Sequence, residues 1–179
     1  LFATSLLSNM SYADSLFGNS DDNGQLVFGA ELNPLTFIAS NDSRVYFNAG
    51  VSIFNRNNSS EIAIPVDYKN IQIDGDQFTA FSISAHYRKF LKKDIRGYYF
   101  SGVTRLTTLN SDTTKLGIGF GVGYRKFFDS GLYWGWGVVL GRYFGDNDSY
   151  DSEHISRFES IEDKAVMFDV ELLKVGITF

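Results

Sequence analysis

Hydrophobic and polar side chains alternate along most of this chain. The clearest stretch is residues 115–128, where Leu116, Ile118, Phe120 and Val122 are separated by single glycines. Successive side chains of a β-strand point to opposite faces, so this spacing predicts a strand with one apolar face and one face of small residues. The pattern repeats after a break of only three residues, Asp129 to Gly131, which predicts a tight hairpin.

Eight segments share this alternation, and we predict a strand in each of them. They are residues 25–39, 44–55, 61–68, 78–90, 98–109, 115–128, 131–144 and 165–179. Pro34 lies inside the first segment and predicts a bulge or an irregular end there. Several of these segments have 11–15 residues, whereas strands of soluble proteins usually have about 5–6.

The distribution of side chains between the two faces distinguishes a membrane barrel from a soluble one. The segments 115–128 and 131–144 carry large apolar residues, including Trp134 and Trp136, on one face and glycine or ionic groups on the other. A lipocalin-like barrel has the opposite arrangement, with its apolar residues inside. A strand of roughly 9–11 residues is long enough to cross a bilayer, and a closed barrel pairs every backbone group there. We therefore predict an all-β fold, an eight-stranded antiparallel up-and-down transmembrane β-barrel.

The connections between the predicted strands give the barrel an orientation. An even number of strands places both ends of the barrel domain on one side, together with short turns near 56–60, 91–97 and 129–131. The longer connections, near 40–43, 69–77, 110–114 and 145–164, then face outward, as is usual in bacterial barrels. The loop 145–164 has a net charge of −5. Its carboxylates suit Ca²⁺ or Mg²⁺ bridging to lipopolysaccharide phosphates, although it contains no spaced calcium-loop motif.

The first residues have the layout of the end of a secretory signal peptide. Residues 1–13 carry no charge, and an apolar run is followed by Ser11-Tyr12-Ala13, with small residues at the two positions that signal peptidase recognises. We expect residues 1–13 to be the remnant of a signal peptide and residues 14–179 to form the barrel domain.

Composition excludes several classes of function. The chain has 179 residues, no cysteine and 2 histidines, which excludes disulfide scaffolds and thiolate metal sites and argues against a histidine-rich metal centre. Its net charge of −5 argues against nucleic acid as the main partner. We expect no cofactor and no bound metal.

The last eight residues, LLKVGITF, carry a more specific resemblance. Leu173, Val175, Ile177 and Phe179 alternate up to a terminal phenylalanine, similar to the terminal assembly signal of Gram-negative outer-membrane proteins. From about residue 14 onward the chain resembles a small outer-membrane barrel of the OmpA, OmpX and OmpW-like and opacity-protein kind. This resemblance implies a monomer in the bacterial outer membrane. Its partners would be outer-membrane lipid, lipopolysaccharide and the outer-membrane assembly machinery.

Aromatic residues gather near the predicted short turns, where an interfacial girdle is expected. They are Phe90, Tyr98, Tyr99, Phe127, Phe128, Tyr133 and Phe179.

Charged residues on the inward-facing positions predict an ionic network inside the barrel. They are Glu31, Glu61, Asp67, His86, Arg88, Arg105, Arg125 and Lys174. The interior of an eight-stranded barrel is just wide enough to be filled by side chains, and unpaired charges there are costly. We expect the acids and bases to form a salt-bridged plug. A catalytic or conducting role for these residues is the alternative.

Two motifs have an enzymatic interpretation. His154 and Ser156 form a His-x-Ser sequence similar to that of outer-membrane lipid A deacylases, which implies a base and a nucleophile. However, Arg157 stands where that family has asparagine, and the segment lies in the acidic loop. The alternating glycines at 117–123 do not fit a phosphate loop, which needs glycines at a strand-to-helix turn.

The sequence thus favours a non-enzymatic outer-membrane barrel with a structural or surface-interaction role through its outward loops. The alternatives are a lipid A-modifying hydrolase and a narrow channel for small solutes.

Overall fold

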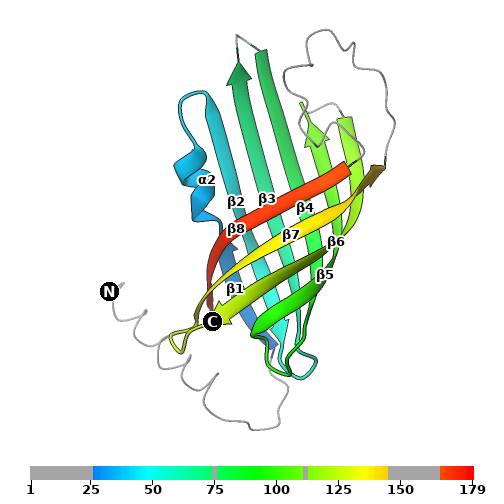
Figure 1. Cartoon of the computed structure of the whole chain (residues 1–179). Helices are drawn as coiled ribbons and strands as arrows, with labels where there is room; N and C mark the ends of the chain where they lie inside the picture. Colours follow the sequence, from blue (N-terminus) through cyan, green and yellow to red (C-terminus); the bar gives the residue numbers. More distant parts are fainter. Residues whose placement is uncertain (1–25, 74–75, 111–112, 145–165) are drawn as a thin grey trace.

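The strands predicted from the alternation close into a barrel. The computed structural model describes residues 26–73, 76–110, 113–144 and 166–179. Within these residues eight strands follow one another in chain order, and β1 pairs with β8 to complete the circle (Figure 1). The strands are β1 (Leu26–Leu32), β2 (Arg44–Asn55), β3 (Ser60–Ile73), β4 (Asp76–Phe90), β5 (Gly97–Leu109), β6 (Thr113–Phe127), β7 (Leu132–Phe144) and β8 (Val166–Thr178).

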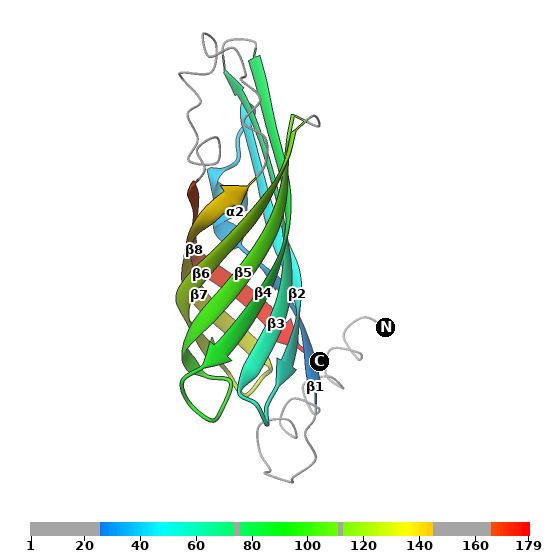
Figure 2. The ribbon, with the colours of Figure 1, turned by 90° about the vertical axis from the view of Figure 1, so that its right-hand side faces the viewer.

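Every neighbouring pair of strands is antiparallel, which confirms the predicted all-β, up-and-down barrel. The strands run obliquely around the barrel, and three short turns, at 56–59, 91–96 and 128–131, lie at the end that holds the C-terminus (Figures 1 and 2). In the last turn, Phe128 N–H donates to the Leu132 carbonyl at 2.8 Å, and Gly131 has φ 79°. Glycine accepts this left-handed conformation without steric cost. The predicted hairpin is therefore present.

Side chains alternate between the interior and the outer surface along each strand. Arg125 on β6 is 1% exposed, whereas Phe120 on the same strand is 79% exposed. Large apolar side chains point outward on all eight strands that the structure describes. The outer surface of the barrel is thus its apolar side, and charged residues occupy the interior.

The first predicted strand, residues 25–39, is wrong beyond Leu32. β1 ends there, and a short helix, α2 (Pro34–Ala39), follows it. The Asn33 side chain accepts a hydrogen bond from Leu35 N–H at 3.0 Å and so caps the helix. Pro34 occupies the first turn, where its fixed φ suits a helix and its missing N–H is not needed. Apolar and polar residues still alternate beyond Leu32, which is why the sequence predicted a strand there. The Asn33 cap starts a helix at this point instead.

The glycines of β6 make room for long side chains on neighbouring strands. A Cβ on Gly123 would lie 2.4 Å from the Tyr99 ring and 2.4 Å from the Trp136 carbonyl oxygen. A Cβ on Gly119 would lie 2.3 Å from Met167 Cε. The stripe of inward glycines therefore allows a narrow lumen to hold large residues.

The interior is filled in layers. A cluster of apolar and aromatic side chains lies nearest the short turns: Val27, Phe54, Phe90, Ile95, Tyr99, Phe127 and Tyr133. A second cluster lies further along the strands: Val103, Val139, Tyr143 and Met167. Four of the seven aromatic residues expected in an interfacial girdle belong to the first cluster, so that assignment is wrong for Phe90, Tyr99, Phe127 and Tyr133. Their proximity to the turns suggested a girdle, but their parity along the strands directs them inward.

Replacing Gly123 by alanine tests this packing. We expect Gly123→Ala to destabilise the barrel by about 1–3 kcal/mol, because both the backbone oxygen and the tyrosine ring must move. Gly102→Ala is the matched control, since nothing lies within 4 Å of a Cβ built there. Urea unfolding of the protein in detergent measures both. Equal stability of the two variants would contradict the close packing at Gly123.

Candidate functional site

Six charged side chains form a compact cluster in the barrel interior, next to the aromatic layer. Three are acidic and three are basic, and each is at most 5% exposed. We call this set the lumen ion cluster: Glu31 from β1, Glu61 from β3, Arg88 from β4, Arg125 from β6, and Glu171 and Lys174 from β8. Its formal charges balance, and its members come from strands on all sides of the barrel.

Glu61 is the central acceptor of the lumen ion cluster. Its Oε1 accepts hydrogen bonds from Arg88 Nη1 and Arg125 Nη1, both at 2.6 Å, and from Ser52 Oγ at 2.8 Å. Hydrogen bonds between ionised partners are stronger than neutral ones. One carboxylate therefore ties β6 to β3 across the lumen and also links β3 to its neighbours β2 and β4.

Glu31 links β1 to the same two arginines. Its Oε2 lies 2.7 Å from Arg125 Nη2, and its Oε1 lies 3.1 Å from Lys174 Nζ. The Tyr133 hydroxyl donates to Oε2 at 3.3 Å. Because Arg125 spans Glu61 and Glu31, the two carboxylates are held at a fixed separation by one planar guanidinium.

Glu171 completes the lumen ion cluster, although the sequence analysis did not include it. Its Oε1 lies 2.5 Å from Lys174 Nζ, and its Oε2 lies 3.7 Å from Arg88 Nη2. Glu171 and Lys174 are three residues apart, so strict alternation places them on opposite faces. The register between β7 and β8 shifts between Gly135 and Gly137, and this irregularity turns both side chains inward. Local sequence offers no clear signal for such a bulge.

The aromatic layer supports the arginines of the lumen ion cluster. The Arg125 guanidinium carbon lies 4.6 Å from the Tyr133 ring centroid, and that of Arg88 lies 5.4 Å from the Tyr99 ring. Stacking a guanidinium on an aromatic face is favourable when water is excluded. The buried cations are thus held by carboxylates on one side and by rings on the other.

His86 lies beside the cluster rather than within it. It is 1% exposed, and its Nδ1 lies 3.5 Å from Arg88 Nη2. Its Nε2 has no hydrogen-bond partner among the described residues. A cation adjoins this ring on one side, no carboxylate is paired with it among the described residues, and the ring fills the interior of the barrel.

Arg105 pairs with a carboxylate that the sequence analysis did not include, and Asp67 forms no salt bridge with an interior arginine among the described residues. The partner of Arg105 is Asp169 on β8, and Arg105 also donates from Nε to Ser84 Oγ at 2.8 Å. Asp67 accepts a hydrogen bond from the Asn48 side chain. β5 and β8 are not neighbours in the barrel, so their residues meet only across the lumen. Parity along a strand identifies inward residues but does not select partners on opposite walls.

The described residues offer no arrangement for metal binding. No group of three or more His, Asp or Glu side chains among them is placed to hold a metal ion. The carboxylates of the lumen ion cluster already accept from arginine and lysine. The lumen ion cluster can therefore fill the interior of the barrel with paired, balanced charges.

Several predicted features lie outside the described residues. They are the signal-peptide remnant at 1–13, the acidic loop 145–164, and His154 and Ser156 within that loop. The glycines at 117–123 lie within β6, on a regular strand rather than at the turn of a phosphate loop.

The C-terminal segment forms the seam of the barrel. Phe179 N–H donates to the Phe28 carbonyl at 3.0 Å, and Ile177 pairs with Ala30 on β1. Ile177 and Phe179 are exposed on the outer surface, while Leu173 and Val175 are half-buried. The alternating residues proposed as an assembly signal thus lie where the barrel closes.

Comparison with known proteins does not assign this chain to a family. No family model, no curated protein and no solved structure matches it. No helix among the described residues is long and apolar enough to span a membrane.

Removing the central carboxylate tests the lumen ion cluster. We expect Glu61→Ala to destabilise the barrel by about 3–5 kcal/mol, because two buried arginines lose their shared acceptor. Asp94→Ala, which removes an exposed carboxylate in the 91–96 turn, should change stability by less than about 0.5 kcal/mol. Urea unfolding in detergent compares them. Similar midpoints for both variants would mean that the cluster contributes little to stability.

Proposed function

We propose that this protein is a monomeric barrel of the bacterial outer membrane. Its lumen is closed, and its role is structural or interactive, exercised through its outward loops. The observation that carries this proposal is the distribution of side chains around the whole circumference. Large apolar residues face outward on all eight described strands, and balanced charges are buried inside. In water this arrangement would expose a continuous apolar surface. In lipid the apolar outer face contacts acyl chains, and the charged groups remain paired inside the barrel.

The height of the apolar surface supports a bilayer. On β6 the outward apolar positions run from Leu116 to Tyr124, which is nine residues. At about 3.4 Å per residue and a tilt of about 40°, this covers roughly 21 Å along the barrel axis, close to the ~25 Å band of outer-membrane barrels. Lys126 lies beyond one end of the run and Thr114 beyond the other. The apolar band is thus bounded by polar residues.

An outer row of aromatic residues supports the position of one interface. The Tyr98 and Tyr124 ring centroids are 5.1 Å apart, and those of Tyr124 and Trp134 are 5.9 Å apart. This row crosses three adjacent strands near the short turns. Amphipathic rings at this depth are typical of a membrane–water boundary.

The filled lumen favours a closed barrel over a channel. The aromatic layer, the lumen ion cluster and the second apolar cluster follow one another along the interior. Each interior layer is built from several strands, so a continuous water path would require breaking ion pairs that link opposite walls. Outer-membrane lipid and lipopolysaccharide are the proposed surroundings. The assembly machinery is the proposed partner of the C-terminal segment that ends at Phe179.

Arginine placed on the outer surface tests lipid contact. We expect Phe120→Arg and Val138→Arg to destabilise the barrel in phospholipid vesicles by about 2–4 kcal/mol near the midplane. Thr114→Arg, on the same strand as Phe120 but beyond the apolar run, should cost only about 0–1 kcal/mol. Reversible urea unfolding followed by tryptophan fluorescence measures these differences. Equal stability of all three variants and the parent would argue against an outer surface in contact with lipid.

Conductance tests the closed lumen. We expect the intact protein, once inserted in a planar bilayer, to show no steady open-channel current. Glu61→Ala serves as a comparison, because it weakens the link across the lumen and should raise the frequency of transient openings. Reproducible steady currents from the parent protein would favour the narrow channel and contradict the closed barrel.

A further inference from the structure

The barrel wall is incomplete on the side where β1 ends. β1 pairs with β8 only from Gly29 to Leu32, and β8 continues to Val166 without a strand on that side. On the other flank, residues 44–48 of β2 also extend past β1. α2 occupies this gap between β2 and β8 (Figure 1). A helix, rather than a hydrogen-bonded strand, therefore fills this part of the wall.

Hydrogen bonds tie α2 to β2, on one side of the gap. Asn33 N–H donates to the Asn48 carbonyl at 3.0 Å, and Tyr46 N–H donates to Ser40 Oγ at 2.8 Å, so both ends of the helix are tied to β2. No backbone hydrogen bond joins α2 to β8 in the part of the chain that the structure describes. Side-chain packing alone connects the helix to β8.

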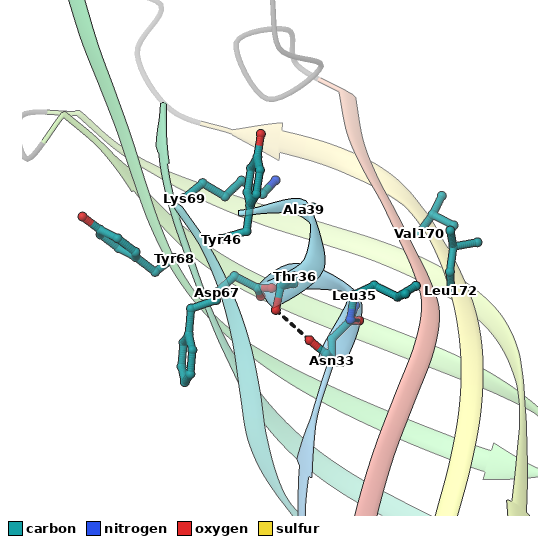
Figure 3. A pocket seen from close by; sticks show the side chains of 11 residues that line it. Asn33, Leu35, Thr36, Ala39, Tyr46, Asp67, Tyr68, Lys69, Val170 and Leu172 are labelled. Carbon is teal, nitrogen blue, oxygen red and sulfur yellow. Dashed lines mark hydrogen bonds between the residues drawn. The ribbon is translucent and has the colours of Figure 1, made fainter. Parts of the chain in front are cut away.

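A cavity of about 220 Å³ lies between α2, β2, β3 and β8. Its walls combine residues from both faces of the barrel (Figure 3). Phe47, Val170 and Leu172 belong to the outer apolar surface, whereas Asp67 belongs to the interior face of β3. In Figure 3, Leu35 extends toward Leu172, and Asp67 points toward Thr36 of the helix. The cavity therefore passes through the wall from the apolar surface toward the lumen.

The inner end of the cavity has an unused hydrogen-bond acceptor. Oδ2 of Asp67, which lines the cavity, is buried and has no hydrogen-bond partner among the described residues. Buried polar atoms without partners are costly. A ligand group that donates a hydrogen bond satisfies this acceptor. Lys69 also lines the cavity and disfavours a purely cationic group, whereas a neutral hydroxyl is compatible with both charges.

We propose that this cavity is a lateral binding site for the end of an alkyl chain that carries a hydroxyl group. The chain lies along the apolar outer side, against Phe47, Val170 and Leu172, and the hydroxyl donates to Asp67 at the inner end. The volume is below the ~300–1,000 Å³ of pockets for drug-sized ligands, which fits one end of a chain rather than a whole lipid. This inference rests on the proposed insertion of the barrel in lipid.

The probe is a dodecanol analogue with a photoreactive diazirine in its chain, added to the protein in phosphatidylcholine vesicles. After irradiation, mass spectrometry maps the labelled peptides. We expect labelling of α2 and of the Val170–Leu172 region of β8 that unlabelled dodecanol suppresses. Dodecanoate and dodecylamine should need about tenfold higher concentrations for the same suppression, because Asp67 repels the dodecanoate carboxylate and Lys69 repels the dodecylamine ammonium group.

Two variants test the two ends of the site. Val170→Trp fills the cavity and should abolish the suppressible labelling. The control is Val138→Trp, which adds the same bulk on β7 at the cross-strand neighbour of Val170 and should leave the suppressible labelling intact. Asp67→Asn should raise the half-maximal dodecanol concentration about tenfold, because a charged acceptor is replaced by a neutral one. A gel-shift assay of the folded barrel checks that each variant folds.

The outcomes separate this inference from the membrane proposal. If the outer surface around Phe120 is labelled but dodecanol suppresses no labelling of α2 or β8, the lateral site is contradicted. The proposed insertion of the barrel in lipid is still supported by that result. Equal suppression by all three competitors, or an unchanged Asp67→Asn variant, contradicts the hydroxyl assignment. Absence of labelling anywhere on the outer surface contradicts insertion itself.

Discussion

The balance of charge inside the barrel is the constraint on which this structure depends. Three carboxylates and three cations, all buried, are linked through Glu61 and Glu31 across the interior. Removing any one leaves an uncompensated charge in a confined space. The glycine stripe of β6, the aromatic layer and the inward side chains of five strands are arranged around this cluster. An apolar exterior is possible only because the polar groups have their partners inside.

Alternation with a period of two was sufficient to predict eight strands, their order and the inward residues on most of them. Two features could not be predicted in this way: irregularities that break the period of two, and contacts between residues on strands that face each other across the lumen. The bulge in β8 brings Glu171 and Lys174 to the same side, which alternation excludes. The pairing of Arg105 with Asp169 joins strands that are not neighbours. Proximity to turns suggested an outer position for Tyr133, but its parity places it inside.

Asn33 and Pro34 explain the least regular part of the barrel wall, where α2 replaces the continuation of β1. A capping side chain and a proline end β1 after seven residues and start α2, although the apolar alternation continues. The barrel remains closed near the short turns, where β1 pairs with β8. Further along, a helix held by β2 covers the gap. In lipid, unpaired backbone groups of β8 require such a cover. This irregularity also creates the cavity whose inner end is Asp67.

The two tryptophans of the chain, Trp134 and Trp136, allow the most direct test of lipid contact. Both point toward the outer surface of β7, and Trp136 lies two residues further from the short turns. For the barrel in vesicles, lipids brominated along the acyl chain should quench the fluorescence of both, and Trp136 should respond more to bromines placed deeper. Acrylamide in the water should quench little. Strong quenching by acrylamide with none by brominated lipids would contradict a barrel embedded in a membrane.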